Sequence, residues 1–366
     1  MKLFGDRYFS IIVLILVFGG IALFFSASLG LLARASSSPW KIVFNQVMLG
    51  LIPGFILLFG IRFFPQKMLV RLALPFYIFT IILTSLVFVP HVGLSLNGAH
   101  RWINLGFTTF QPGELLKISV ILMLSAYLAR AKDSIQSYTK GLIPFGIIVG
   151  VPSLLLILQP NTSTLMVIGI SCMAVYFLAG APLRDFAIMI TGSVVLLTGL
   201  VLTHPYLQKR VDTFIHPSHA PQGSGYHIQQ SLIAIGSGQV IGRGFGQSVQ
   251  KFNYLPEAES DSVFAVYGEE FGFVGTVFLV LLFAAFALRG LMIAAASPTI
   301  FGTLAVTGLT LLITISAFLN IGALIGIFPL TGLPLPFISH GGTALLSALA
   351  SVGIILNIAA HKGKKR

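Results

Sequence analysis

Long apolar runs dominate this chain. No Asp, Glu, Lys or Arg occurs in residues 8–33, 42–61, 72–100, 141–183 or 290–361. A helix that crosses a bilayer needs about 20 mostly apolar residues, so each shorter run fits one span and the two longest each fit two. The runs predict ten spans, at about residues 9–32, 42–64, 69–90, 114–131, 142–159, 162–181, 186–203, 264–292, 301–327 and 340–361. A transmembrane barrel is excluded, because its strands would alternate polar and apolar residues.

Composition supports the same class of protein. Hydrophobic residues make up 56% of the chain and charged residues only 9%, whereas a soluble domain is about a quarter charged. The single cysteine, Cys172, lies in an apolar run, so no disulfide framework or cysteine zinc site organises the fold. The chain is therefore predicted to be an all-α polytopic membrane protein, with residues 1–366 forming one integral domain and the first apolar run retained as a helix.

The distribution of charge predicts the topology. The net charge of +12 does not indicate nucleic acid, because Lys and Arg gather in short clusters between apolar runs. An even number of spans places both termini on one side. That side carries three of the ten acids and fourteen of the 22 cations: Lys2, Arg7, Arg62, Lys67, Arg71, Arg130, Lys132, Lys140, Arg184, Arg289, Lys362, Lys364, Lys365 and Arg366. The positive-inside rule then predicts cytoplasmic termini.

The opposite face is predicted to carry the chemistry. It holds a long connection at residues 204–263, before the eighth span, and shorter loops at 91–113 and 328–339. None is long enough to bury a core of its own, so any active site must use loops and helix mouths. Because this face lies on the opposite side of the membrane from the cytoplasm, we do not expect a cytosolic nucleotide to be the substrate.

The first outer cluster is NGAHRWINLGFTTFQPGELLK, residues 97–117. Glu114 and Lys117 are three residues apart and share one helix face. An unpaired ammonium one turn inside a span is costly, so Lys117 needs a carboxylate or phosphate partner. Glu114 is the local candidate and Asp261 the distant one; of the two we expect Asp261. Trp102 fits an interfacial aromatic belt as well as it fits a ligand contact.

The second cluster, residues 223–275, contains a Gly-rich loop with Arg243, followed by Lys251. The glycines would let the backbone approach a ligand, and the two cations could bind phosphate, although a flexible surface loop is the simpler interpretation. It is not a Walker loop, because no GK[ST] closes it.

Asp261 lies just before the apolar run that begins at Phe264. Partial desolvation at a helix mouth raises the pKa of a carboxyl group and makes it a better general base. The same residue could cap the helix, and both roles can hold together. For Glu269 and Glu270, deeper in that helix, we expect a buried hydrogen bond or ion pair with a neighbouring helix.

The third cluster is GIFPLTGLPLPFISHGGTA, residues 326–344. Its closely spaced prolines cannot continue a helix and predict a rigid loop before the last span. Ser339 and His340 are its candidate polar contacts.

Three motifs in this chain order, NGAHRWINLG...QPGELLK, SVQKFNYLPEAESDSVFAVYGEEFGFVG and GLPLPFISHGG, resemble the SEDS family (shape, elongation, division and sporulation), which includes FtsW and RodA. The resemblance covers essentially the whole chain. The triplet Gly268–Glu269–Glu270 is more similar to the FtsW branch than to the RodA branch.

The resemblance implies a peptidoglycan glycosyltransferase in the bacterial cytoplasmic membrane. Such an enzyme polymerises lipid II at the outer face, during division or elongation, together with a class B penicillin-binding protein and other divisome or elongasome proteins. Asp261 matches the essential Asp of the family's LPEA-x-x-D motif. The matching substrate-binding positions are Arg101, Trp102, Glu114, Lys117, Arg243, Lys251, Glu257 and Ser339. The chain departs from the common pattern at Gly113, Asn161, Glu259, Ser260, Ser262 and His340.

The expected reaction is one inverting displacement in which Asp261 deprotonates the acceptor hydroxyl. No cofactor is certain, and a divalent cation (Mg²⁺ or Mn²⁺) is an open candidate for helping the cations neutralise the departing diphosphate. The alternatives are a flippase for the lipid-linked precursor and a scaffold that recruits a synthase. A flippase would place functional charge across the midplane and on both faces, whereas here the unusual charge lies at the outer mouth.

Overall fold

The computed structural model describes residues 6–33, 39–96, 99–106, 108–216, 223–252 and 254–361. The α-helices are α1 (Arg7–Ser28), α2 (Pro39–Asn45), α3 (Ile52–Arg62), α4 (Gln66–Ser85), α5 (Pro112–Ala131), α6 (Leu142–Leu158), α7 (Thr162–Leu178), α8 (Leu183–Thr203), α9 (Pro205–Ile215), α10 (Ser224–Ser237), α11 (Val263–Ala295), α12 (Ile300–Leu324) and α13 (Gly342–Ala360). A π-helical turn, η2 (Gln46–Leu51), joins α2 to α3, and short 3-10 turns follow α1 (Leu29–Ala33), α4 (Leu86–Phe88) and α5 (Lys132–Ser134). The strands are β1 (Gly93–Leu96), β2 (Ala99–Asn104) and β3 (Thr109–Phe110).

The predicted spans are helices in the structure. Among the described residues, eight helical segments are long and apolar enough to cross a membrane. The remaining two predicted spans, 142–159 and 162–181, correspond to α6 and α7, which are apolar but only 17 residues long. At 1.5 Å per residue such helices reach about 25 Å, the short limit for a span. The prediction of an all-α polytopic membrane protein is confirmed.

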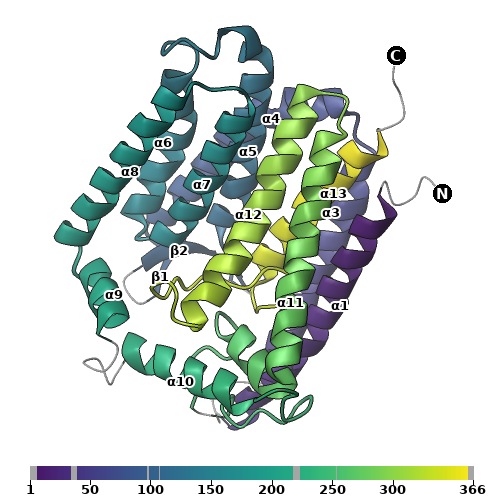
Figure 1. Ribbon diagram of the computed structural model, residues 1–366, viewed down its shortest axis with the longest axis vertical. Helices are drawn as coiled ribbons and strands as arrows, with labels where there is room; N and C mark the ends of the chain where they lie inside the picture. Colours follow the sequence, from purple (N-terminus) through teal and green to yellow (C-terminus); the bar gives the residue numbers. More distant parts are fainter. Residues whose placement is uncertain are drawn as a thin grey trace.

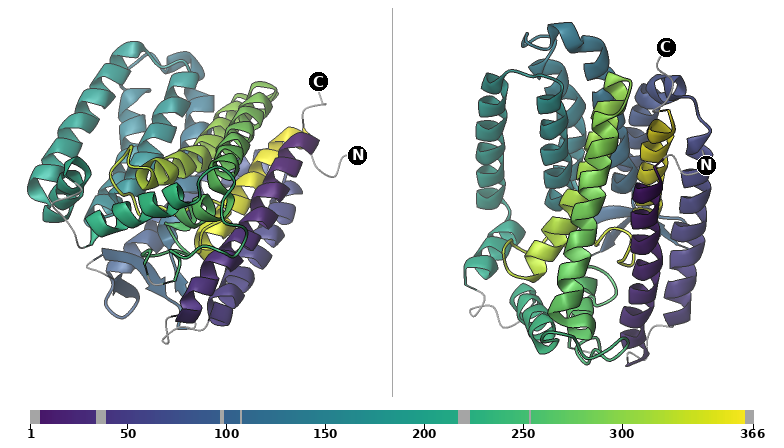
Figure 2. Two further views of the ribbon diagram at one scale, coloured as in Figure 1. Left: turned by 60° about the horizontal axis from the view of Figure 1, so that its bottom comes forward. Right: turned by 45° about the vertical axis from the view of Figure 1, so that its right-hand side comes forward.

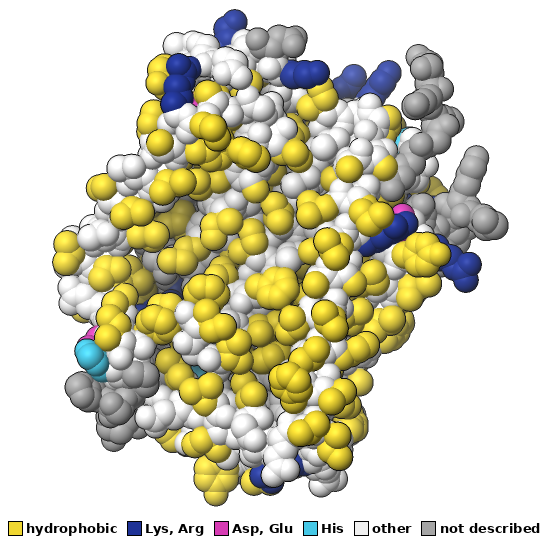
Figure 3. All heavy atoms as spheres, viewed as in Figure 1, with side chains coloured by type: hydrophobic (Ala, Val, Ile, Leu, Met, Phe, Trp, Pro, Cys, Tyr) yellow, Lys and Arg dark blue, Asp and Glu magenta, His cyan; other side chains and the backbone are white. Residues whose placement is uncertain are grey.

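The two ends of the helix bundle differ. Figures 1 and 2 show that α1 begins and α13 ends at the same end, whereas the small sheet, α9 and α10 lie at the opposite end. In Figure 3, hydrophobic side chains cover the middle of the molecule, and most visible Lys and Arg side chains lie near the upper end. Both termini on one side of the bundle agree with an even number of spans.

Burial separates a core from a periphery. Within the most apolar stretch of each helix, 78% of α12 and of α13 is buried inside the protein, whereas none of α8 is. One end of α8 is fixed where the Tyr176 hydroxyl of α7 donates to Asp185 Oδ2 (2.7 Å), and its other end continues into α9. The packed core therefore lies around α12 and α13. Helix α8 lies at the edge of the bundle (Figure 1).

The backbone of α11 is broken near its N-terminal end, at Gly272 (φ 64°, ψ −161°). The preceding loop satisfies the groups that this break frees. The N–H groups of Arg243 and Gly244 donate to the carbonyl oxygens of Glu269 and Glu270, at 3.0 and 2.9 Å, and two N–H groups beyond the break donate back to the loop. Non-helical backbone at membrane depth is tolerated where protein groups satisfy it in this way.

The connections predicted to lie on the outer face contain structure that the sequence did not predict. The connection at residues 91–113 forms three short antiparallel strands in the order β1-β2-β3. Residues 97, 98 and 107 of this connection lie outside the described part. Trp102 pairs with Leu94 and Ile103 with Phe110. Strands this short show no clear alternating pattern, which is why an irregular loop was expected. Within 204–263, which includes the undescribed residues 217–222 and 253, α9 and α10 form two short helices.

Candidate functional site

Asp261 lies in the turn that leads into α11. The side-chain amide of Asn320, on α12, donates both to the carbonyl oxygen of Asp261 and to that of Leu333, each at 2.7 Å. One amide therefore fixes the turn against α12 and against the Pro-rich loop, which is the part of residues 326–344 that precedes α13. The carboxyl group is only half-buried as a whole, but its Oδ1 atom is buried and accepts no hydrogen bond within the described structure.

The surroundings of Asp261 raise its pKa to about 7. Burial is the largest cause, and the nearby carboxylates of Glu257 and, to a smaller extent, Glu259 act in the same direction. A hydrogen bond with its own backbone and the guanidinium of Arg210 oppose the rise. A carboxyl group that titrates near neutral pH suits general-base catalysis better than an ordinary aspartate does.

A large cavity of about 820 Å³ opens beside this turn. Four of the predicted site residues line it: Arg101, Trp102, Glu114 and Glu257. Ser260, next to Asp261 in the chain, and Gly332 also line it. The cavity therefore brings together the sheet, the start of α5, the Asp261 turn and the Pro-rich loop.

Arg101 is held rigidly at the cavity wall. Its Nε donates to the carbonyl of Gln159 (3.4 Å) and its Nη2 to the carbonyl of Pro160. Asn161, at a position where the family commonly has an Asp, caps α7 by accepting from the Thr164 N–H (3.4 Å), and both residues line the cavity. Arg101 is thus anchored to the turn between α6 and α7.

Arg210 is a site residue that the sequence interpretation missed. It lies on α9, which the apolar pattern did not reveal, and its guanidinium lies 5.7 Å from the ring of Tyr206. Its electrostatic influence reaches both Asp261 and Arg101. The basic pair Lys209–Arg210 in an otherwise weakly charged outer segment was the only available signal.

Lys117 does not pair with Asp261 as we expected. Its Nζ lies 2.8 Å from Glu114 Oε1, the local partner, and Glu114 Oε2 also accepts from the hydroxyl of Ser347 on α13 (2.9 Å). The i, i+3 spacing on one helix makes this pair geometrically easy. Asp261 is consequently tuned by burial, by its acidic neighbours and by Arg210, without Lys117.

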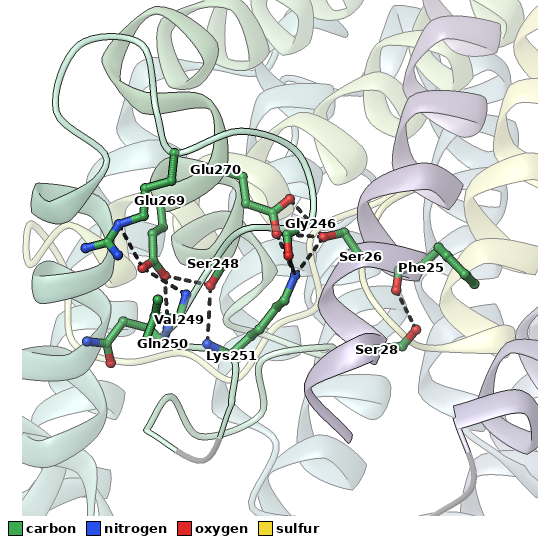
Figure 4. A network of polar contacts seen from close by, with 11 residues as sticks. Phe25, Ser26, Ser28, Gly246, Ser248, Val249, Gln250, Lys251, Glu269 and Glu270 are labelled. Atoms are coloured by element: carbon green, nitrogen blue, oxygen red, sulfur yellow. Dashed lines mark hydrogen bonds and ion pairs between the residues drawn. The ribbon is translucent and has the colours of Figure 1, made fainter. Parts of the chain in front are cut away.

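Arg243 and Lys251 both contact acids of α11, and Figure 4 shows Lys251 with Glu269 and Glu270. Lys251 is fully buried and its Nζ lies 2.8 Å from Glu270 Oε1, while also donating to Ser26 Oγ on α1 (3.1 Å) and to the Gly246 carbonyl (2.8 Å). Arg243 Nε lies 3.4 Å from Glu269 Oε1. Both glutamates are buried and paired, as expected, but only Ser26 of α1 is a partner from a neighbouring helix, and the other partners come from the loop.

Glu269 also binds the loop backbone. It accepts from Ser248 Oγ (2.6 Å) and from the N–H groups of Val249 and Gln250 (both 3.1 Å). Neither Lys251 nor Arg243 lines the 820 Å³ cavity. The structure places both predicted phosphate ligands in contacts that fix the loop, away from the cavity wall.

The glycines of this loop serve the same packing. A Cβ at Gly242 (φ 81°) would lie 2.2 Å from the carbonyl oxygen of Glu270, and one at Gly272 would lie 2.4 Å from the backbone nitrogen of Gly242. The close backbone approach that Gly permits is therefore to α11, rather than to a ligand.

Ser339 and His340 lie where the Pro-rich loop meets η2. Ser339 is buried, and its hydroxyl accepts from the N–H of Leu335 (2.8 Å). The buried Gln46 side chain holds this segment by donating to the Ser339 carbonyl (3.1 Å) and accepting from the Gly341 N–H (2.9 Å). His340 lines the cavity, and its N–H donates to the carbonyl of Glu259 (2.8 Å). Ser339 therefore shapes the loop, whereas His340 faces the cavity.

Comparisons with known proteins agree with this architecture. The family model for FtsW, RodA and SpoVE, described as Cell cycle protein, matches residues 6–364. Stage V sporulation protein E of Bacillus subtilis is 38% identical over 279 residues, which cover 76% of each chain. A probable peptidoglycan glycosyltransferase FtsW of Thiomicrospira cyclica is 34% identical over 364 residues, covering 96% of this chain and 91% of that protein.

Solved structures share the fold. A chain of a peptidoglycan synthase complex, described as coordinating polymerization and crosslinking, matches with a TM-score of 0.79 at 28% identity, covering 96% of this chain and 98% of that one. The rod shape determining protein RodA of Thermus thermophilus matches with a TM-score of 0.69 at 28% identity, covering 96% and 97% of the two chains. The resemblance inferred from the motifs is confirmed: this protein belongs to the FtsW/RodA/SpoVE family of cell cycle proteins.

Proposed function

We propose that the protein is a peptidoglycan glycosyltransferase that polymerises lipid II, with Asp261 as general base. Its relatives include proteins named as probable peptidoglycan glycosyltransferases. The observation that carries the proposal is the position of Asp261: a half-buried carboxyl group with a pKa of about 7, beside a cavity of about 820 Å³.

The proposed step is a single displacement at the donor sugar. Asp261 removes the proton from the acceptor hydroxyl as that oxygen forms a bond to the donor C1. The C1–O bond to the diphosphate breaks, and its electron pair leaves with the diphosphate. Because attack and departure occur on opposite faces, the configuration at C1 inverts, and one base suffices since the diphosphate is a good leaving group.

Charge on the leaving diphosphate needs cationic partners. Arg101, on the cavity wall, is the first of these. In the described part of the chain no three His, Cys, Asp or Glu side chains come together as a metal-binding group. We therefore expect any Mg²⁺ or Mn²⁺ that assists the reaction to be bound chiefly through diphosphate oxygens.

We propose that the sheet end of the bundle faces the outside of the bacterial cytoplasmic membrane. Lys and Arg concentrate at the end where the termini lie, which the positive-inside rule assigns to the cytoplasm. A peptidoglycan synthase complex is among the structural matches. We expect a class B penicillin-binding protein to be the partner, together with other division or elongation proteins.

Purified protein in liposomes containing fluorescent lipid II tests the proposal. Glycan polymer is measured for the wild-type protein, with and without a co-purified class B partner, and for Asp261→Asn. We expect Asp261→Asn to lower polymerisation by about 10²- to 10⁴-fold. Asp212→Asn removes an exposed acid of α9 and is the matched control. Wild-type polymerisation by Asp261→Asn would refute the base assignment, and lipid II translocation without polymer would favour the flippase.

A further inference from the structure

Two partly buried arginines, Arg101 and Arg210, form no ion pair in the part of the chain that the structure describes. Five ion pairs form among the described residues, and neither Arg101 nor Arg210 takes part in any of them. Both are only partly exposed, and burial together with their mutual repulsion lowers the pKa of Arg101. Asp261 is the acid whose charge influences Arg210. Two adjacent, partly buried cations beside this one carboxyl group are costly unless a further anion joins them.

Gly332 shows where such an anion fits. Gly332 lines the 820 Å³ cavity and has a positive φ of 63°. A Cβ built on it would lie 3.8 Å from Asp261 Oδ2 and 3.9 Å from Arg210 Nη2. The carboxylate and the guanidinium thus border one small space without forming an ion pair, which leaves room for a group that contacts Arg210 and lies next to the base.

Arg101 contributes a second guanidinium from the sheet. Its two contacts to backbone carbonyls use two of its five N–H donors and hold the group in place. Tyr206 and Arg210 both influence the pKa of Arg101, and the Arg210 guanidinium lies 5.7 Å from the Tyr206 ring, so the two arginines are close enough to interact. Paired, fixed guanidinium forks suit a doubly phosphorylated anion, because each can bind phosphate oxygens in bidentate fashion.

We infer that Arg210 and Arg101 bind the diphosphate of the lipid-linked sugar donor, next to Asp261 and across the space that Gly332 leaves open. This inference rests on the proposed function and deepens it. When the C1–O bond breaks, the electron pair moves to the diphosphate oxygen, and the two guanidinium groups stabilise that charge. Arg210 is therefore assigned to the leaving group, and Asp261 to the acceptor proton.

Binding of unreactive probes tests the inference. Farnesyl diphosphate, farnesyl monophosphate and farnesol carry no sugar and cannot be polymerised. With the full chain in nanodiscs, we expect wild-type affinity to fall in that order. Arg210→Gln should weaken farnesyl diphosphate binding about tenfold or more and leave farnesol binding unchanged. Lys209→Gln removes the exposed neighbouring cation of the same helix and should change each affinity less than about twofold.

Equal weakening by Arg210→Gln and Lys209→Gln, or no weakening by Arg210→Gln, would overturn the inference. If Arg210→Gln also loses farnesol binding, the variant has lost its fold, and Arg210→Lys is tested in its place. Reduced discrimination by Arg210→Lys between farnesyl diphosphate and farnesyl monophosphate supports the diphosphate site. Wild-type discrimination refutes it. Asp261→Asn separates the two proposals, because it removes a negative charge beside the site and should bind farnesyl diphosphate at least as tightly as wild type while failing to polymerise lipid II. Normal polymerisation by that variant would refute the base and leave the diphosphate site standing.

Discussion

Two groups of charges at the end of the bundle that carries the small sheet have opposite character. In the closed cluster, formed by Lys251, Glu269 and Glu270, the ammonium and both carboxylates have nearby partners from α1, α11 and the loop. In the open site, formed by Asp261, Arg101 and Arg210, one oxygen of Asp261 is buried without a hydrogen-bond partner among the described residues, and neither arginine forms an ion pair there.

The difference separates structural from functional charge. Buried polar groups in folded proteins are normally satisfied, and an unsatisfied one calls for an explanation such as a ligand. The closed cluster holds the Gly-rich loop against α11 and leaves nothing for a substrate. The open site lacks the partners that a substrate would supply. The closed cluster therefore fixes the loop that precedes the Asp261 turn of the open site. Substitutions can perturb the closed cluster and the open site separately.

The largest expected effect is on stability, in the closed cluster. Lys251→Met leaves Glu270 buried without its cation, so we expect a loss of about 3–5 kcal/mol in the free energy of unfolding. The double variant Lys251→Met/Glu270→Gln removes both charges and should recover much of this loss. Thermal unfolding in detergent measures both. A Lys251→Met protein of wild-type stability that binds farnesyl diphosphate poorly would instead make Lys251 part of the open site.

Two glycines of the same loop provide the next largest effect. Gly242 and Gly246 both have positive φ, 81° and 79°, but only Gly242 abuts α11; a Cβ on Gly246 has nothing within 4 Å. Gly246→Ala should cost about 1 kcal/mol for the left-handed conformation. Gly242→Ala should cost about 2 kcal/mol more, because Cβ would collide with the Glu270 carbonyl. Equal melting temperatures would show that the loop does not depend on this close packing.

The open site should respond to pH. With the pKa of Asp261 at about 7, kcat/KM for polymerisation should rise with pH and level off above about pH 7. Glu257→Gln removes a charge that raises this pKa, and Arg210→Gln removes one that lowers it. We expect their midpoints to move down and up respectively, each by about half a pH unit. Shifts in the same direction would contradict this electrostatic account.

Stability gives an independent check on the same carboxyl group. The folded-state pKa of Asp261 is raised above its unfolded value, so the folded protein binds more protons between about pH 4 and pH 7. This group therefore destabilises the fold increasingly as pH rises through that window. Asp261→Asn cannot ionise, and its melting temperature relative to wild type should increase from pH 5 to pH 8. A constant difference would place the pKa of Asp261 near its ordinary value.

Much of the fold could be predicted from the sequence, because apolar runs of span length have few alternative structures in a membrane. Asp261 could also be identified, since an acid at the mouth of an apolar helix and the LPEAESD motif are both local features. The paired acids Glu269 and Glu270 were correctly expected to be structural, because charges inside a span need partners.

The rest depends on contacts between distant segments. Arg101, Arg210, Asp261 and Gly332 come from a strand, a short helix, a turn and a Pro-rich loop, and no periodicity relates them. Lys251 was expected to bind phosphate because it follows a Gly-rich loop, and to bind substrate because it matches a position of the family motif. Its burial by Ser26 of α1 is a tertiary contact over 225 positions, which no local pattern contains.

Lys117 gives the smallest expected effect and tests the boundary between the two kinds of charge. It contacts Glu114 at 2.8 Å and does not contribute to the shifted pKa of Asp261. Lys117→Met should therefore leave the pH midpoint of kcat/KM unchanged within about 0.2 units, because Arg210 rather than Lys117 supplies the opposing charge. It should lower stability by about 1 kcal/mol, and the double variant Glu114→Gln/Lys117→Met should restore part of it, since both members of the pair are then neutral. A midpoint raised by half a unit in Lys117→Met would make Lys117 an electrostatic partner of Asp261 in the working enzyme, and would extend the open site across the start of α5.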